Sequence, residues 1–329
     1  MSTMFTTTFA TVDTVESGVP RVPIGQWIED GLDWVLDHAG DAFDAIANAM
    51  DNTSSALTDL LQWPPAVVMV LVLALIAWAA RNWRLAVCAA VILTLVIGME
   101  QWDNAMQTLS VVLVATVIAL IIGVPIGIAA ARWDGVSSIV RPVMDLMQTM
   151  PAFVWLVPVV MLFGIGVPAG MVATVIFALP PAVRLTELGI RQVDPEIVEA
   201  GQAFGGTPRQ ILGGIQLPLA MPTVMAGVNQ VIMLALSMAV IAGLVGGGGL
   251  GNAVMTAISR LDVALGFEAG LSVVVLAIYL DRVTASVGRQ RKKTGTRRLS
   301  RLRRSRQEDD PPKISEHDEE LNELQNITN

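Results

Sequence analysis

Residues that enzymes commonly use for catalysis or metal binding are scarce in this chain of 329 residues. It holds one cysteine, Cys88, so no disulfide forms within the chain and cysteine supplies no metal site. The two histidines, His38 and His317, lie in polar segments near the ends. A histidine-centred triad or multi-histidine metal site in the apolar body is therefore excluded. No GxxxxGK[ST] phosphate loop occurs, so any ATP that the protein uses is hydrolysed by another chain.

Charge is also scarce, since 15% of the residues are charged and 53% are hydrophobic. In soluble proteins about 25% of the residues are charged and about 45–50% are hydrophobic. Apolar runs of about 20 residues cross a bilayer core of about 30 Å. The sequence therefore predicts an all-α polytopic integral membrane protein with about seven transmembrane helices. The expected spans are Pro64–Ala80, Leu85–Met99, Met106–Ala131, Val143–Ile165, Val167–Val183, Val224–Val245 and Gly266–Leu280.

The distribution of basic residues predicts the orientation of these spans. Arg81 and Arg84 lie between the first two spans, Arg132 and Arg141 lie between the third and fourth, and 11 bases follow the last span within residues 282–306. Loops rich in Lys and Arg stay on the cytoplasmic side. We therefore expect an outer amino end and a cytoplasmic carboxyl end in a plasma membrane.

Three segments are expected from these patterns. Residues 1–62 form an acidic extracytoplasmic segment, in which apolar residues recur every three or four positions from Ile28 to Met50 and predict an amphipathic helix over Ile24–Leu61. Residues 63–282 form the transmembrane domain. Residues 283–329 form a cytoplasmic tail, first basic and then acidic, whose composition predicts disorder.

A specific pattern lies in the predicted cytoplasmic loop at residues 185–221. A Glu-Ala-Gly triplet is followed by a glycine four positions on and by Ile-x-Leu-Pro ten positions further. Physically this spacing predicts a short helix, a glycine at which the chain reverses, a second short helix, and a proline that opens the next span. The residues concerned are Glu199, Ala200, Gly201, Gly205, Ile215, Leu217 and Pro218.

This pattern resembles the EAA loop of binding-protein-dependent ATP-binding cassette (ABC) importers, with Gly201 in place of an alanine. The resemblance implies that these residues couple a partner ATPase to the membrane spans. From about Pro23 to Arg289 the chain also resembles the permease subunits of glycine betaine and proline betaine importers, for instance in DLMQTMPAFVWLVPVVMLFGIG. The resemblance implies a fold like that of type I ABC importer permeases and a prokaryotic inner membrane. It implies four kinds of partner: an ABC ATPase that uses ATP, an extracytoplasmic substrate-binding protein, a second permease copy and membrane lipid. It implies no nucleic acid, and no cofactor bound by this chain.

Other readings stay open at this point. The solute of such an importer is also consistent with choline, carnitine or an amino acid, and a secondary carrier independent of ATP is a further alternative. The near absence of charged residues inside the spans argues against a proton-coupled carrier. Asn229 and Gln230 are candidates to line a path or to join helices. Arg141 and Asp145 are expected to form an i, i+4 pair on a helix surface.

Overall fold

The computed structural model describes residues 23–308, with side chains up to Ser286, and this range is helical with no strand. The predicted all-α class is confirmed. The long elements on the amino side are α1 (Ile24–Gln62), α2 (Ala66–Ala80), α3 (Trp83–Gly98), α4 (Trp102–Arg132), α5 (Asp134–Thr149) and α6 (Ala152–Phe163). The elements that follow are α7 (Val167–Arg191), α8 (Pro195–Ala203), α9 (Pro208–Ile211), η1 (Leu212–Gln216), α10 (Leu217–Ile241), η2 (Ala242–Val245), α11 (Gly249–Arg260) and α12 (Val263–Glu308).

Several helices have the length and the apolar composition of membrane spans. Among the described residues, four helical stretches are long and apolar enough to cross a bilayer: Trp102–Arg132, Val167–Arg191, Pro208–Val245 and Val263–Ser286. The number rises to six if each of two bent pairs, α1 with α2 and α5 with α6, counts as one span. The shorter apolar helix α3 has 16 residues and is about 24 Å long. Each of the seven predicted spans falls on one of these helical segments.

The predicted span Val143–Ile165 is not a single helix. The structure divides it between α5 and α6, which meet at an angle of 102°. Met150 adopts an extended backbone, with φ −71° and ψ 135°, because the ring of Pro151 disfavours the helical conformation of the residue before it. The two prolines that follow Trp63 produce the same 102° bend between α1 and α2. Hydropathy does not report such breaks.

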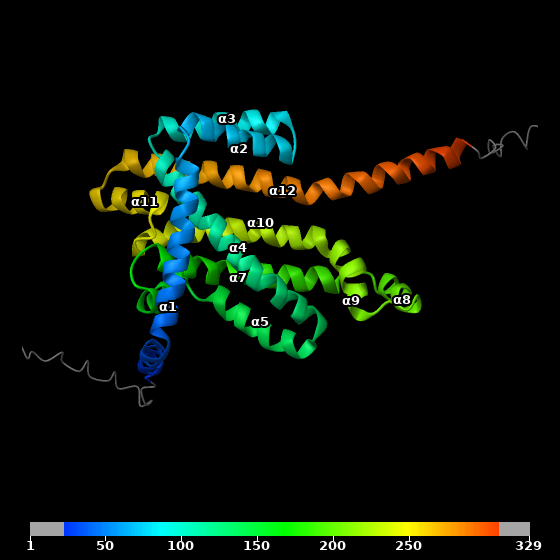
Figure 1. Cartoon of the computed structure of the whole chain (residues 1–329), viewed down its shortest axis with the longest axis horizontal. Coiled ribbons are helices and arrows are strands. Elements are labelled where there is room, and N and C mark those ends of the chain that lie inside the picture. The colour runs from blue at the N-terminus through cyan, green and yellow to red at the C-terminus, as the bar shows by residue number, and fades with distance from the viewer. Residues whose placement is uncertain (1–22, 309–329) are drawn as a thin grey trace, which may run out of the picture.

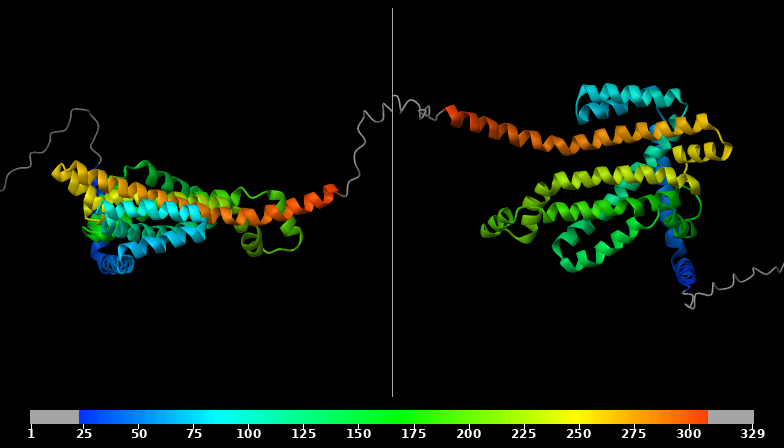
Figure 2. Two further views of the ribbon diagram at one scale, coloured as in Figure 1. Left: turned by 90° about the horizontal axis from the view of Figure 1, so that it is seen from above. Right: turned by 180° about the vertical axis from the view of Figure 1, so that it is seen from behind.

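The spans run side by side, and the other elements cover the two ends of the bundle (Figure 1). The amphipathic helix α1 is present as predicted, and it crosses one end of the spans together with α11. Helices α8 and α9 project from the opposite end. Views from above and behind show the α2–α3 hairpin beside α12, which continues well past the bundle (Figure 2).

The last helix extends to Glu308, into the basic segment for which composition predicted disorder. Residues 309–329, which include most of the acidic part of the predicted tail, lie outside the described residues.

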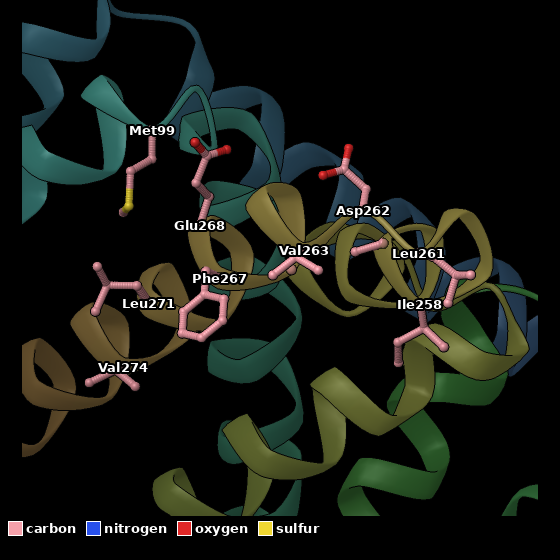
Figure 3. A pocket seen from close by; sticks show the side chains of 12 residues that line it. Met99, Ile258, Leu261, Asp262, Val263, Phe267, Glu268, Leu271 and Val274 are labelled. Atoms are coloured by element: carbon pink, nitrogen blue, oxygen red, sulfur yellow. The ribbon is translucent and has the colours of Figure 1, made fainter.

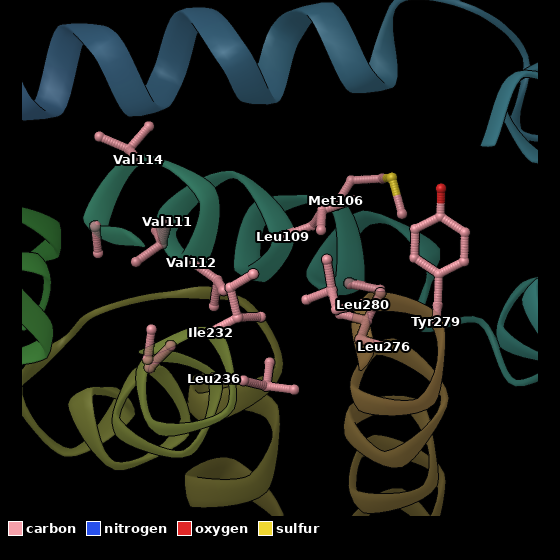
Figure 4. Close-up of a cluster of buried hydrophobic side chains, with 14 of the residues drawn as sticks. Met106, Leu109, Val111, Val112, Val114, Ile232, Leu236, Leu276, Tyr279 and Leu280 are labelled. Carbon is pink, nitrogen blue, oxygen red and sulfur yellow. The ribbon is translucent and has the colours of Figure 1, made fainter. Parts of the chain in front are cut away.

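The hydrophobic core centres on α4, whose buried side chains meet α10 on one side and α12 on another (Figure 4). Val112 points from α4 toward Ile232 of α10, and the side chain of Met106 points toward Tyr279 of α12. The hydroxyl of Tyr279 donates a hydrogen bond of 3.1 Å to the carbonyl oxygen of Leu73. This bond ties α12 to the α2–α3 hairpin.

Glycines let α7 approach its two main neighbours closely. A Cβ atom on Gly127 of α4 would lie 2.6 Å from the carbonyl oxygen of Val183 in α7, and one on Gly227 of α10 would lie 2.9 Å from Cβ of Leu185. In a membrane, helix association depends on such close packing, because lipid removes most of the hydrophobic drive. Helices α4, α7 and α10 therefore form one tightly packed layer.

Replacing Gly127 with alanine should weaken this layer. The added methyl group has no room against the α7 backbone, and overpacking of this kind costs about 1–3 kcal/mol. We expect Gly127→Ala to lower the thermal unfolding temperature of the detergent-solubilised protein. Gly270→Ala in α12 is the matched control, since nothing lies within 4 Å of the added atom. Equal melting curves for the two variants would contradict the proposed packing.

Candidate coupling site

The predicted loop at 185–221 is shorter in the structure than the sequence suggested. Helix α7 continues to Arg191, and α10 already begins at Leu217. The part that projects from the bundle is therefore residues 192–216, which we call the projecting turn. It contains α8, α9 and η1, and it lies at the end of the molecule opposite α1 (Figure 1).

Both ends of α8 are fixed by local hydrogen bonds. At its start the Asp194 carboxylate accepts a bond of 3.0 Å from the backbone N–H of Glu196. At its end the N–H of Gly205 donates to Gln202 O (2.8 Å) and the N–H of Gly206 donates to Gly201 O (3.1 Å). This pair of bonds is a Schellman motif. It requires a left-handed residue, and Gly205 has φ +79°. The predicted reversal at Gly205 is confirmed.

The motif residues Gly201 and Ile215 are brought together, although 14 positions separate them. A Cβ atom on Gly201 would lie 2.6 Å from Cδ1 of Ile215 and 3.7 Å from a side-chain carbon of Ile211. The position therefore needs a small residue because α8 packs against η1 here. Contact is with the end of a flexible side chain, so an alanine fits after a small shift of Ile215.

The second half of the projecting turn leads directly into a span. Thr207 and Gln210 form a capping box at the start of α9, in which each side chain bonds to the backbone N–H of the other residue. Five residues of π-helix, Leu212–Gln216, then pass into α10, and Pro218 occupies the first turn of α10. The expected second helix is present, and Pro218 opens the span as predicted. No loop separates the turn from the membrane helix.

The exposed surface of the projecting turn includes both predicted and unpredicted residues. Glu199 and Ala200 are exposed on α8. Phe204, which the sequence analysis did not single out, is 95% exposed at the tip between α8 and α9, and Ile197 is also exposed. Phe204 and Ile197 therefore give this part of the projecting turn an exposed apolar surface. A single phenylalanine in a polar loop was the signal that could have revealed it.

Beside the projecting turn, a buried carboxylate joins α5 to the end of α7. Oxygen Oε1 of Glu187 accepts hydrogen bonds from the hydroxyl of Ser137 (2.7 Å) and from Nη2 of Arg141 (2.8 Å), and it lies 3.0 Å from Nε of Arg191. Arg191 also donates to Asp134 (2.7 Å). The network holds α5 against the residues that lead into α8.

The expected pair of Arg141 with Asp145 is wrong. Arg141 turns to Glu187, and Asp145 pairs with Arg184 of α7. The i, i+4 rule considers one helix alone, whereas both side chains here find partners on the neighbouring helix. Both pairs therefore join α5 to α7.

The two polar residues of α10 differ in their surroundings. The amide of Asn229 donates to Asp281 (3.0 Å) and accepts from the hydroxyl of Thr284 (2.7 Å), both on α12. Its polar atoms therefore join two helices. Gln230 is exposed on another face of α10. The structure does not bring Asn229 or Gln230 together with the residues of the projecting turn.

The fold and the projecting turn together define a class: a multi-pass membrane subunit that presents a short helical turn at one end of its spans. The chain belongs to the family described as binding-protein-dependent transport system inner membrane component, which matches residues 123–293. It is thus a permease subunit of that transport family. The matched range contains α7, the projecting turn and α10.

Three related permease proteins are similar in sequence to this chain over most of its length. It is 48% identical to the glycine betaine/proline betaine transport system permease protein ProW of Escherichia coli strain K12, over 84% of this chain and 78% of that protein. It is 43% identical to the glycine betaine transport system permease protein OpuAB of Bacillus subtilis strain 168, over 84% of this chain and 98% of that protein. It is 45% identical to the glycine betaine/carnitine transport permease protein GbuB of Listeria monocytogenes, over 83% of this chain and 98% of that protein.

A solved structure shows the same fold. An inward-facing form of the MetNI methionine ABC transporter aligns with 57% of this chain and 94% of its own, with a TM-score of 0.51 and 22% identity. The predicted fold, an ABC importer permease, is confirmed.

Removing the Glu187 carboxylate should loosen α5 from α7. The Glu187 side chain is 5% exposed, and hydrogen bonds to charged groups contribute about 1.5–3 kcal/mol each. We expect Glu187→Ala to lower the unfolding temperature clearly. The control is Asp145→Asn, which breaks an α5–α7 ion pair whose carboxylate is 62% exposed and which should cost at most about 1 kcal/mol. If Asp145→Asn is as harmful as Glu187→Ala, the buried network is not what holds α5.

Proposed function

We propose that this chain is the membrane-spanning subunit of an ATP-driven importer of glycine betaine and proline betaine. The observation that carries the proposal is the projecting turn, which displays an exposed Phe204 and is continuous with α7 and α10. A turn of this kind transmits the movement of a partner to the spans. The names of the three relatives, each of which includes glycine betaine, support the solute.

In this proposal the chain does no chemistry of its own. A separate ABC ATPase binds the projecting turn through Phe204, Glu199 and the neighbouring surface of α8, and its closure moves the turn. A separate binding protein delivers the solute at the opposite end, beside α1 and α11. Betaines carry a quaternary ammonium, which aromatic rings bind through cation–π attraction. We place that recognition on the binding protein.

A second copy of the chain completes the path. Four side chains at spacings of three and four residues are exposed along α10, namely Ala226, Gln230, Met233 and Ser237. Such a partly polar stripe suits the boundary between two copies better than lipid does. We infer that Gln230 lines the path, whereas Asn229 serves to join α10 to α12.

The segments have distinct places in this proposal. Residues 1–62 lie outside the cell, 63–282 form the membrane domain, and 283–329 lie in the cytoplasm. The projecting turn is the cytoplasmic coupling loop, because it follows the carboxyl end of α7 on the same side as the arginines of the α2–α3 and α4–α5 connections. Carnitine, named for one relative, is the alternative solute with direct support.

The function is tested by uptake of labelled glycine betaine into proteoliposomes that hold the chain with its ATPase and binding protein. We expect uptake that needs ATP and the binding protein and that proline betaine inhibits. Phe204→Ala should abolish uptake and leave the melting temperature unchanged, because the ring touches the ATPase and not the fold. Val91→Ala, at an exposed position on α3, is the control.

Several outcomes would contradict this assignment. Uptake without ATP would favour a secondary carrier. Uptake of carnitine, choline or an amino acid in preference to betaine would replace the solute. Normal uptake by Phe204→Ala would remove the projecting turn from coupling.

Orientation is tested separately by thiol labelling in intact cells. With Cys88 replaced by serine, Asp33→Cys should react with a membrane-impermeant reagent from outside, since α1 carries it at the outer end. Ser300→Cys should react only after lysis, because the basic segment stays inside. Labelling of position 300 in intact cells would reverse the proposed orientation.

A further inference from the structure

Helices α3 and α12 pack along a seam that is open at both ends. At one end a cavity of about 470 Å³ lies between the start of α3 and the part of α12 around Tyr279. Three arginines line it, Arg81, Arg84 and Arg282, together with the apolar side chains of Leu85 and Ile278. The combination of clustered guanidinium groups with an apolar wall is unusual for a surface that only fixes topology.

The cluster has an excess of positive charge. Among residues 23–286, neither Arg81 nor Arg84 has a carboxylate within 4.0 Å, and Nε of Arg282 lies 3.9 Å from an oxygen of Asp281. Arg84 lies over the ring of Trp83, at 5.9 Å from its centroid. Three like charges around one cavity attract an anion, and guanidinium groups match the oxygens of a phosphate.

An apolar track leads away from the arginines along α12. Ile278, Val274 and Leu271 are all exposed and recur at steps of three and four from Arg282 toward the middle of the bundle. From Arg282 to Leu271 the helix rises by about 16 Å. That is about half of the hydrocarbon thickness of a bilayer. A single acyl chain of one leaflet fits this length.

The other end of the seam has the opposite charge. There, where α11 turns into α12 beside Met99, a cavity of about 820 Å³ is lined mainly by apolar side chains such as Phe267 and Leu271, with the carboxylates of Asp262 and Glu268 at its edge (Figure 3). It has no basic lining residue. An anionic headgroup is repelled at this end and attracted at the arginine end, so the charges select one leaflet.

We propose that the α3–α12 seam binds an anionic phospholipid of the cytoplasmic leaflet. The phosphate lies among Arg81, Arg84 and Arg282, and one acyl chain follows Ile278, Val274 and Leu271. Basic pockets between transmembrane helices on the cytoplasmic side bind anionic headgroups in this way. The choice of leaflet rests on the orientation proposed above, whereas binding itself does not depend on transport.

The test is native mass spectrometry of the full chain in detergent, titrated with phosphatidylglycerol or phosphatidylcholine. We expect preferential retention of phosphatidylglycerol. Each arginine-to-glutamine change in the cavity should weaken its binding about fivefold, and the triple variant R81Q/R84Q/R282Q about a hundredfold. The control R301Q/R303Q/R304Q removes the same charge from the tail and should bind as the parent does.

A steric variant tests the apolar track independently of charge. Val274→Trp should weaken binding of phosphatidylglycerol and leave the melting temperature unchanged, because the side chain is exposed. Parent-like affinity in the triple variant, or equal retention of the two lipids, would overturn the proposal. Inorganic phosphate that displaces the lipid at equal concentration would also overturn it, since the arginines alone would then account for binding. The lipid titration uses neither the ATPase nor betaine, so a negative result would leave the proposed function intact.

Discussion

The close approach of α7 to α4 on one side and to α10 on the other is the constraint on which the rest of the molecule depends. Glycines at three crossing points make it possible: Gly127 on α4, Gly189 on α7 and Gly227 on α10. At Gly189 an added Cβ atom would lie 3.1 Å from Cβ of Thr223 and 3.2 Å from the carbonyl oxygen of Ala220. Since lipid surrounds the bundle, such contacts and not hydrophobic burial fix the helices. Helices α4, α7 and α10 are therefore held in one closely packed layer.

The projecting turn is held by the same layer because it connects the end of α7 to the start of α10. Three residues separate α7 from α8, and η1 passes into α10 without a break. Inside the turn, α8 packs on Ile211 and Ile215 through Gly201, and the Schellman motif at Gly205 sets the direction of the chain. The Glu187 network adds α5 to the same unit. A displacement of Phe204 is therefore transmitted to the spans, because no flexible loop lies between them.

Much of this could be read from the sequence, because the features depend on local rules. Apolar runs located the helices, periodicity located α1, and the EAA-like spacing placed Gly205 at a chain reversal. The predictions that failed did so for two different reasons. The bend at Met150 follows from a steric rule that hydropathy ignores. Asp145 pairs with Arg184 on the neighbouring helix and not with Arg141 on its own, and a single sequence does not show which helices are neighbours. The contact of Gly201 with Ile215 explains why the motif requires a small residue there, a reason that appears only when both helices are in place.

We infer that the projecting turn and the α4–α7–α10 layer move as one body when a partner ATPase closes. The most direct measurement is an electron spin resonance distance between labels at Glu196 on α8 and Val117 on α4, both exposed. Labelled copies lacking Cys88 are diluted into unlabelled ones, so that only distances within one copy are seen. We expect the same distance distribution within one copy with and without ATP. In a second, undiluted sample labelled at Glu196 alone, we expect the distance between the labels on two copies to shift on ATP binding. A change of the distance within one copy on ATP binding would contradict movement as one body.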